Sequence, residues 1–585
     1  MTDRFHLLLI KPSRYDDDGY VVQWRRSVLP SNALSVLNAL GEDCAERQVL
    51  GPEVEIRVEA YDDHTGLPPM AELIARLQAA SAGALVGIVG AHSAQFPRGA
   101  DIARRFHAAG IPAVIGGFHV SGAYSMLPEM PPELRQVIDE GISLFVGEGE
   151  GRLDAVIRDA HAGRMRPVYD YGGDLVDLSG AVIPRGLPAT VENRMLVSVK
   201  PADPIEAGRG CPFKCSFCTV INVHGRQART RDPEAIVRQI RSGVARGRDN
   251  FFFTDDNLVR NRRWREIFEG LIRLREEEGL AFNIMIQVDA QSDRDPDFIP
   301  MAVRAGCHQV FIGMESINSE ALASVGKGHN DARRYRRLFL NWKRHGVVIM
   351  VGYILGFPGD TPESIRRDVE TIKRELAVDL AYFYVLTPLP GSEDHVRMWR
   401  DGVELDPDLS HYTSYRSIAP HPTMSTQVLD GLYDEAWRSF YDDAHCERIL
   451  TRHAVLGGSL DHLFPFLLVG RGAHPIDDAH PFEFGFVRVK SRRERRPDMP
   501  REPLMSFLAR RVWETAEAQV RWIRLFRHMS PMVERARAAA AMPRPDDPAL
   551  MVPAAPVETP AGKVGAALEV ASPVSGVAAS SGFAR

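Results

Sequence analysis

Short apolar runs alternate with amphipathic stretches from the N-terminus to about Met165. Two of these stretches, Ala71–Ala80 and Ile102–Ala109, carry apolar residues at helical spacing. Strands that alternate with helices predict a parallel sheet with helices on both faces. We therefore predict a doubly wound, Rossmann-like α/β domain over residues 1–165, with its ligand crevice outside the carboxyl ends of the strands. The apolar runs are Phe5–Ile10, Val54–Ala60, Ala84–Val89, Pro112–Ile115 and Ser143–Val146.

A second alternating series begins at Asp203, after residues 166–200, which have little periodicity and are interpreted as a linker. Helices in this series have clear starts, because Asp232 precedes Pro233 and Thr361 precedes Pro362. Six strand–helix units predict a partial (βα)6, TIM-like barrel over residues 201–395, with an active site at the carboxyl ends of the strands. The candidate strands are Ile205–Ala207, Asn250–Phe253, Asn283–Val288, Gln309–Ile312, Val347–Leu355 and Ala381–Leu386.

The remaining chain has a helical pattern over residues 396–540. Gly431–Tyr441 and Leu504–Met529 are its clearest helices, and His480–Val489 is interpreted as a short strand pair. Trp437 lies in the first of these helices and is expected in the core. Residues 541–585 are rich in Ala, Pro, Val, Gly and Ser with a single aromatic residue, so we predict a disordered tail.

Composition narrows the classes of function. The chain of 585 residues is 44% hydrophobic and 25% charged, which is typical of a globular protein. A net charge of −6 argues against a general nucleic-acid binder, and the basic run Lys490–Arg496 is interpreted as solvated surface. No apolar stretch approaches the ~18 residues of a membrane helix, and no signal peptide is evident. Six cysteines do not make a disulfide framework, so a cytoplasmic protein is expected.

Three of the six cysteines fall within eight positions. Cys211, Cys215 and Cys218 follow a Cys-x3-Cys-x2-Cys spacing, so one short loop offers three thiolates. Thiolates are the usual ligands of iron–sulfur clusters, and three of them leave one iron of a 4Fe–4S cluster open. A zinc site normally takes four ligands in paired spacings, and His224 would complete only an unusual one. Structural thiols are the third interpretation, and it is the one that we favour for Cys307, expected to be buried.

The triplet, with the aromatic Phe217 before its last cysteine, resembles the radical S-adenosylmethionine (SAM) superfamily. The resemblance covers about residues 200–395. It implies that the open iron holds the amino and carboxylate groups of SAM. It also implies that an electron from the cluster cleaves SAM to methionine and a 5′-deoxyadenosyl radical, which removes a hydrogen atom from the substrate. The protein would mainly bind, orient and exclude water.

Later segments resemble further SAM-binding positions of the same superfamily. Asp255, or its neighbour Asp256, stands where the SAM amino group is held, and Glu315 where the ribose is contacted. The other implied SAM contacts are Phe217, Gly352, Ile354, Gly356 and Pro388. Each also has an ordinary structural interpretation, since acidic residues at strand ends often cap helices and glycines often serve turns.

A parallel sheet followed by this barrel resembles the cobalamin-binding radical SAM proteins. Asp62–Gly66 is too short for the Asp-x-His-x-x-Gly motif that supplies a histidine to cobalt, so His64 is interpreted as a loop residue. A dinucleotide or flavin fold, or a domain that has lost its cofactor, remains an alternative. The implied cobalamin contacts are Ser93, Gln95, Gly116, Gly117, His119, Gly147 and Glu148.

The function that these resemblances imply is a radical SAM enzyme, with cobalamin-dependent methylation of an unactivated carbon as its leading reaction. A rearrangement or oxidative cyclisation is the alternative among enzymes, and a non-catalytic iron–sulfur sensor is the alternative from another class. The expected cofactors are a 4Fe–4S cluster, SAM and cobalamin. The expected partners are a small-molecule substrate and a one-electron donor such as flavodoxin or ferredoxin. The sequence identifies neither the substrate nor a catalytic residue.

Overall fold

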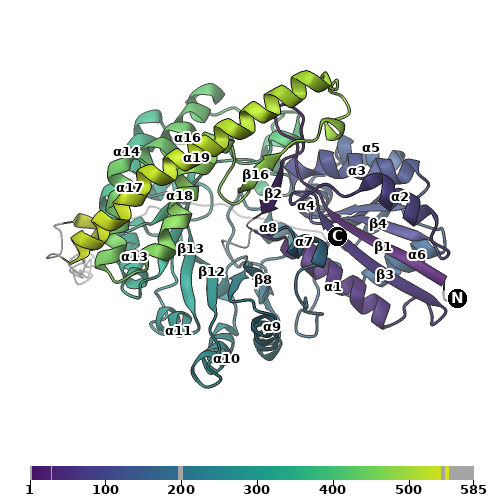
Figure 1. The fold of residues 1–585 in the computed structure, drawn as a ribbon, viewed down its shortest axis with the longest axis horizontal. Helices are drawn as coiled ribbons and strands as arrows, with labels where there is room; N and C mark the ends of the chain where they lie inside the picture. Colours follow the sequence, from purple (N-terminus) through teal and green to yellow (C-terminus); the bar gives the residue numbers. More distant parts are fainter. Residues whose placement is uncertain (1–2, 28, 196–201, 542–546, 552–585) are drawn as a thin grey trace, which may run out of the picture.

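A computed structural model of the chain describes residues 3–27, 29–195, 202–541 and 547–551 (Figure 1). Two parallel sheets lie side by side, and helices of the C-terminal third cover the second sheet. The fold class expected from the sequence is confirmed: a doubly wound sheet, a partial barrel and a mostly helical C-terminal region.

The N-terminal sheet has six parallel strands in the order β3-β1-β4-β5-β6-β7. Side chains alternate between its faces, so Leu7 and Leu9 enter one core and Leu8 and Ile10 the other. The chain passes from β1 to β3 on one side, and then crosses from β3 to β4 on the other side of β1. The boundary between β1 and β4 is therefore the switch point of the sheet. The strands are β1 Asp3–Lys11, β3 Val54–Asp62, β4 Ala84–Ile88, β5 Ala113–Gly116, β6 Ser143–Val146 and β7 Val168–Asp170.

Helices cover both faces of this sheet, as the alternating pattern predicts. Helices α1 and α6 share a core with Leu7 and Leu9, and α2 to α5 pack on the opposite face. The helices are α1 Asn32–Glu46, α2 Met70–Gln78, α3 Phe96–Ala108, α4 Phe118–Met126, α5 Pro132–Asp139 and α6 Leu153–His161. The sequence pattern predicted α2 and α3 only, and α1 and α4 to α6 were not predicted.

The segment that we interpreted as a linker contributes to the sheet. Val168–Asp170 forms β7, which pairs with β6 along Leu144 to Val146. The sheet therefore extends beyond the boundary at residue 165. The same segment contains a short helix, α7 Ala189–Glu192, that packs near β3. Residues 196–200 of the predicted linker lie outside the described residues.

The second sheet holds six parallel strands in strictly sequential order, β8-β11-β12-β13-β14-β15, which is an open (βα)6 barrel. Asp232 caps α9 by accepting a hydrogen bond from the Ala235 amide, and Thr361 caps α14. The strands are β8 Asp203–Ile205, β11 Asn250–Phe253, β12 Asn283–Asp289, β13 Cys307–Glu315, β14 Val348–Leu355 and β15 Leu380–Val385. The helices are α8 Val220–Val223, α9 Pro233–Ala245, α10 Trp264–Glu276, α11 Phe298–Arg304, α12 Ser319–Ser324, α13 Tyr335–Lys343, α14 Pro362–Glu375 and α15 Glu393–Arg400.

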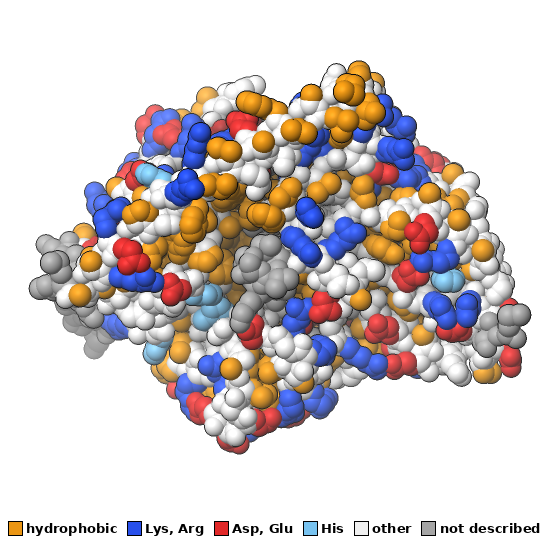
Figure 2. Space-filling view, in the orientation of Figure 1, with side chains coloured by type: hydrophobic (Ala, Val, Ile, Leu, Met, Phe, Trp, Pro, Cys, Tyr) orange, Lys and Arg blue, Asp and Glu red, His pale blue; other side chains and the backbone are white. Residues whose placement is uncertain are grey.

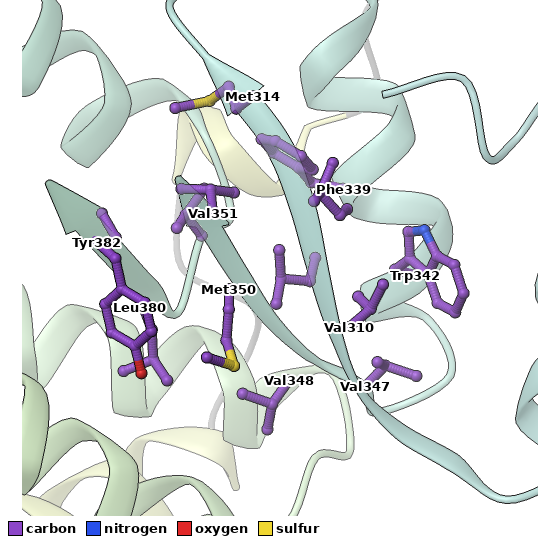
Figure 3. Close-up of a cluster of buried hydrophobic side chains, with 14 of the residues drawn as sticks. Val310, Met314, Phe339, Trp342, Val347, Val348, Met350, Val351, Leu380 and Tyr382 are labelled. Atoms are coloured by element: carbon purple, nitrogen blue, oxygen red, sulfur yellow. The ribbon is translucent and has the colours of Figure 1, made fainter. Parts of the chain in front are cut away.

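The barrel core is dense and apolar. In Figure 3, Phe339 and Trp342 of α13 face Val310 of β13, while Val348 and Met350 of β14 lie beside them. Cys307 begins β13 and is buried in this core, which confirms its structural interpretation. A rigid barrel fixes the loops that follow its strands, and the candidate chemistry lies on those loops.

Four helices of the C-terminal region pack on the barrel and on one another: α16 Thr426–Phe440, α17 Asp443–Val455, α18 Leu460–Asp477 and α19 Leu504–Ala540. Trp437 lies in the barrel core, as predicted. The prediction of a strand pair within His480–Val489 is wrong. The one strand there, β16 Gly485–Val489, pairs instead with β2 Gln23–Ser27 of the N-terminal region. None of the helices in the described residues is long and apolar enough to cross a membrane.

Part of the predicted tail is ordered. Asp547 forms an ion pair with the buried Arg452, and Ala549 is buried against Leu340 and Ala377. The remaining residues of the predicted tail, 542–546 and 552–585, lie outside the described residues.

Candidate functional site

The cysteine loop follows β9 Gly208–Arg209 and is held on two sides by backbone hydrogen bonds. The Ser216 amide donates to the carbonyl of Val325, and the Asp394 amide at the start of α15 donates to the carbonyl of Ser216, both at 3.0 Å. Gly210 has a φ of 93°, and a side chain there would collide with the Gln227 carbonyl. These contacts constrain the loop between β9 and α8.

The three thiols lie on this one loop. Cys215 is buried and the other two are half-buried, and burial raises the pKa of Cys215 to about 11 and that of Cys218 to about 12. No His, Cys, Asp and Glu group in the described residues converges tightly enough to hold a single ion. A cubane has a different requirement, because each thiolate binds its own iron atom. Three sulfurs on one constrained loop fit that group.

Glu315, the expected ribose contact, ends β13 beside this loop. It has a φ of 63°, and the register of β13 and β14 shifts between Gly313 and Glu315. Its carboxylate forms an ion pair with the buried Lys327. A Cβ atom at Gly313 would lie 2.9 Å from this carboxylate, so the glycine leaves the space that the ion pair fills. Lys327 follows α12 without any readable motif, and the sequence analysis missed it.

The other expected SAM contacts gather around the end of β14. Phe217 and Ile354 share a small apolar cluster with Phe357. Gly356 has a φ of 88°, and its amide donates to the carboxylate of Asp360, as does the amide of Phe357. Gly352 lies next to Glu315, and a Cβ atom at this position would lie 3.6 Å from the Glu315 carboxylate. Pro388 is buried just after β15.

Asp255 and Asp256 face different surroundings. Asp255 is buried and its carboxylate accepts a hydrogen bond from the Ala207 amide, so it supports the wall of the barrel. Asp256 accepts from the Gly210 amide at 2.7 Å and lies 3.2 Å from the Nδ1 atom of His224. Of the two, Asp256 is the one that contacts Gly210, the residue before Cys211.

The buried carboxyl of Asp255 is expected to make the free energy of unfolding depend on pH. Burial raises the pKa of its carboxyl from 3.8 to about 8, so the folded chain holds a proton that the unfolded chain releases above pH 4. Its stabilising contribution is complete below pH 4 and is lost as the pH rises to about 8. We expect Asp255→Asn to remove a slope of up to about 1.4 kcal/mol per pH unit in this window. Urea unfolding of both metal-free proteins at pH 5 to 8 measures it, and parallel curves would contradict the assignment.

A cavity of about 500 Å³ opens at the carboxyl ends of the N-terminal strands. Lys11 at the end of β1 and His92 after β4 lie at its mouth, which places it at the switch point of the sheet. It continues down between the sheet and helices α1 and α6, where the lining is apolar. Toward the barrel it reaches His224 and Asp256. The apolar lining is Leu7, Leu9, Val36, Leu37, Leu85, Val89, Val114, Leu153 and Val156.

The expected cobalamin contacts divide between two cavities. Five of them, Gln95, Gly116, Gly117, Gly147 and Glu148, line the 500 Å³ cavity. Ser93 and His119 line a second cavity of about 220 Å³ instead, and Ser93 Oγ lies 3.1 Å from His119 Nδ1. His119 is buried on α4, with its other nitrogen 3.4 Å from Glu133, so it points away from the larger cavity.

Comparison with known proteins identifies the barrel. Residues 205–372 match the radical SAM superfamily. The match runs from Ile205 at the end of β8 to Ile372 in α14, so it covers most of the barrel. Bacteriochlorophyllide d C-8(2)-methyltransferase of Chlorobaculum tepidum is 28% identical over 345 residues, which are 57% of this chain and 72% of that protein. The hopanoid C-2 methylase of Rhodopseudomonas palustris is 25% identical over 55% of this chain and 58% of its own length. The chain thus spans less than two thirds of the latter relative.

Solved structures share the fold of this chain. The radical SAM methyltransferase TsrM from Kitasatospora setae, with cobalamin and a 4Fe–4S cluster bound, superposes with a TM-score of 0.55. It is 18% identical, over 80% of this chain and 95% of that one. The cobalamin-dependent radical enzyme OxsB, with aqua-cobalamin bound, gives a TM-score of 0.54 at 14% identity, over 94% and 82%. At these identities the likeness is one of fold.

A buried charge network joins the radical SAM barrel to the N-terminal sheet. Arg209, next to the cysteine loop, forms ion pairs with Glu148 and Glu150 from the sheet and with Glu206 from the barrel. Arg229 also binds Glu148. Burial alone would raise the pKa of Glu148, but the hydrogen bond from Arg229 and the charge of Arg209 outweigh it and lower that pKa to about 2. The sequence pointed to Glu148 as a cobalamin contact; its carboxylate is committed to this network.

Proposed function

We propose that the chain is a cobalamin-dependent radical SAM enzyme that methylates an unactivated carbon of a small molecule. The observation that carries the proposal is the 500 Å³ cavity. It runs from the apolar face of the N-terminal sheet, past the strand ends at the switch point, to residues of the radical SAM barrel beside the cysteine loop. A cofactor in this cavity therefore lies next to the place where the radical forms.

The cysteine loop is proposed to hold a 4Fe–4S cluster through Cys211, Cys215 and Cys218. When bound, the cluster supplies the electron that cleaves SAM. The chain's own part is to fix the loop, through the Val325 and Asp394 backbone contacts, and to bind SAM beside it. Glu315, held by Lys327, is proposed to orient the ribose, and Asp256 is proposed in place of Asp255 near the amino group.

The large cavity suits cobalamin in shape and chemistry. Its apolar lower part fits the flat heteroaromatic base of the nucleotide tail, and its polar mouth fits the corrin amides. Gly117, with a φ of 139°, packs against the backbone of Ala91, where a side chain would collide, so the loops after β4 and β5 approach each other closely beside the cavity. His64 contacts Ser13 and the Glu483 carbonyl, not this cavity, which supports a cobalamin without a histidine from that loop.

Anaerobic reconstitution with iron, sulfide and hydroxocobalamin tests the proposal. We expect four irons and one cobalt per chain, and methionine and 5′-deoxyadenosine after addition of SAM and dithionite. Flavodoxin or ferredoxin is proposed as the biological electron donor. S-adenosylhomocysteine formed with a methyl acceptor supports methyl transfer, whereas its absence during turnover supports the cyclisation alternative. An iron-loaded chain that makes no 5′-deoxyadenosine would instead be a sensor.

Val114 offers a direct test of the cobalamin site. It is buried in the apolar wall of the cavity, on β5. Phenylalanine at this position fills space that the tail requires, so Val114→Phe should lower cobalt loading about tenfold or more while iron loading stays unchanged. Val114→Ala enlarges the cavity and is the matched control, expected to load cobalt like the parent. Equal cobalt loading of both variants would place cobalamin elsewhere.

A further inference from the structure

The exposed apolar side chains of this protein are concentrated on one surface. Of the fourteen large hydrophobic side chains exposed in the described residues, ten belong to β16 and the N-terminal two thirds of α19. Trp513 and Val512 are each 70% exposed and Met505 is 75% exposed. We call this surface the α19 face. Its members are Phe486, Val489, Leu504, Met505, Leu508, Val512, Trp513, Val520, Ile523 and Phe526.

The α19 face is a helical stripe and not a scatter of single residues. At ~100° per residue, Met505, Val512 and Ile523 lie along one line of the helix to within about 20°. The stripe extends over about six turns of helix, or about 30 Å. The opposite side of α19 packs against the rest of the protein, since Phe507 and Met529 are buried there. The apolar stripe therefore has no covering within the described residues.

Positive charge surrounds the stripe. Residues 488–527 contain twelve Lys and Arg and five Asp and Glu, a net charge of +7 in a chain of −6. Lys490, Arg488 and Arg510 pair with Asp16 and Asp18. Four further arginines are exposed and form no ion pair within the described residues: Arg493, Arg501, Arg524 and Arg527. Figure 2 shows orange and blue side chains together along the upper edge of the molecule, where α19 runs.

We propose that the α19 face binds the surface of an anionic lipid bilayer. An exposed helix with Trp, Phe and Leu on one side and arginines beside them is the arrangement that lies flat at the boundary of headgroups and acyl chains. Trp513 and Phe526 enter that boundary, and the unpaired arginines meet lipid phosphates. The chain would associate peripherally, and no helix of the described residues is long and apolar enough to cross the bilayer. The proposal is independent of the proposed function.

Two other occupants fit the face less well. A second copy of the chain, paired α19 to α19, would place two surfaces of net positive charge against each other, and like charges oppose such pairing. The C-terminal segment 552–585 is long enough to reach the face. However, it contains one Lys, one Arg and two Glu, so its side chains offer no net negative charge to complement the arginines.

Vesicle sedimentation tests the proposal with the full chain. We expect binding to vesicles that mix phosphatidylcholine with phosphatidylglycerol at a molar ratio of about two to one, and at least tenfold weaker binding to pure phosphatidylcholine. Trp513→Ala and the double variant Arg524→Glu with Arg527→Glu should each weaken binding about tenfold or more. These side chains are exposed, so the fold is expected to be unaffected.

Trp399→Ala with Arg400→Glu is the matched control, because Trp399 is 42% exposed and belongs to α15, not to the α19 face. It should bind vesicles like the parent. Several outcomes overturn the proposal: no binding by the parent, equal binding by all variants, or a dimer in analytical ultracentrifugation that Trp513→Ala dissociates without any vesicle binding. Vesicle binding only after truncation at Met551 also overturns it, since the C-terminal segment would then cover the face.

Discussion

Cys215→Ala is expected to reduce bound iron to background after reconstitution and to lower the formation of 5′-deoxyadenosine about 100-fold or more. Cys215 is buried in a loop that the Val325 and Asp394 backbones hold in place, so no neighbouring side chain can replace its thiolate. A cluster that loses one of three thiolates has two open irons and is not retained through purification. The same result is expected for Cys211→Ala and Cys218→Ala.

Cys446→Ala is the control, because Cys446 is also buried but lies in α17, far along the chain from the loop. It should retain iron and SAM cleavage. Iron analysis and chromatography of the nucleoside products measure both quantities on one sample. Retained cleavage in Cys215→Ala, or equal loss in Cys446→Ala, would contradict the cluster assignment and, with it, the proposed function.

The architecture was predictable because it follows local patterns. The strands β6 and β11 begin and end where apolar runs do, and the start of α14 follows from Thr361 and Pro362. Pairing across long sequence distances was not predictable. The strands β2 and β16 come from opposite ends of the described chain. Each strand is short and mixed in polarity, so its sequence does not indicate which strand it pairs with.

The candidate site was predictable in the same uneven way. The three cysteines and the glycines at 117, 147 and 356 were predictable as site residues, because each belongs to a short local motif. All three glycines have a positive φ in the structure. The choice between Asp255 and Asp256 needed the structure, since adjacent residues face opposite directions and only the backbone decides which faces the loop. The role of Lys327 was not predictable from the sequence, because it depends on the ion pair with Glu315, which lies on a different element.

Arg209 is expected to be the most costly single replacement outside the cysteine loop. Arg209→Met leaves the carboxylates of Glu148, Glu150 and Glu206 buried with fewer partners, and breaking a buried ion pair from one side typically costs about 3–5 kcal/mol. Arg226→Met is the matched control. Its pair with Glu393 is 41% and 45% exposed, and such surface pairs contribute about 0–1 kcal/mol. Urea unfolding at pH 7 compares the two.

The pH dependence distinguishes lost charge pairing from lost packing. The pKa of Glu148 is lowered to about 2 in the folded parent, so this group stabilises the fold above its unfolded pKa near 4.5 and loses that effect as the pH falls toward 2. In Arg209→Met the carboxyl of Glu148 is protonated more easily, so the difference in unfolding free energy between parent and variant should shrink below about pH 4.5. A second change, Glu150→Gln, removes one of the uncompensated charges and should recover part of the loss at pH 7. A deficit that is constant with pH and unaffected by Glu150→Gln would mean that Arg209 acts through its packed carbon chain, and that the sheet and the barrel are held together by other contacts, such as the close approach of Gly122 to Gly391.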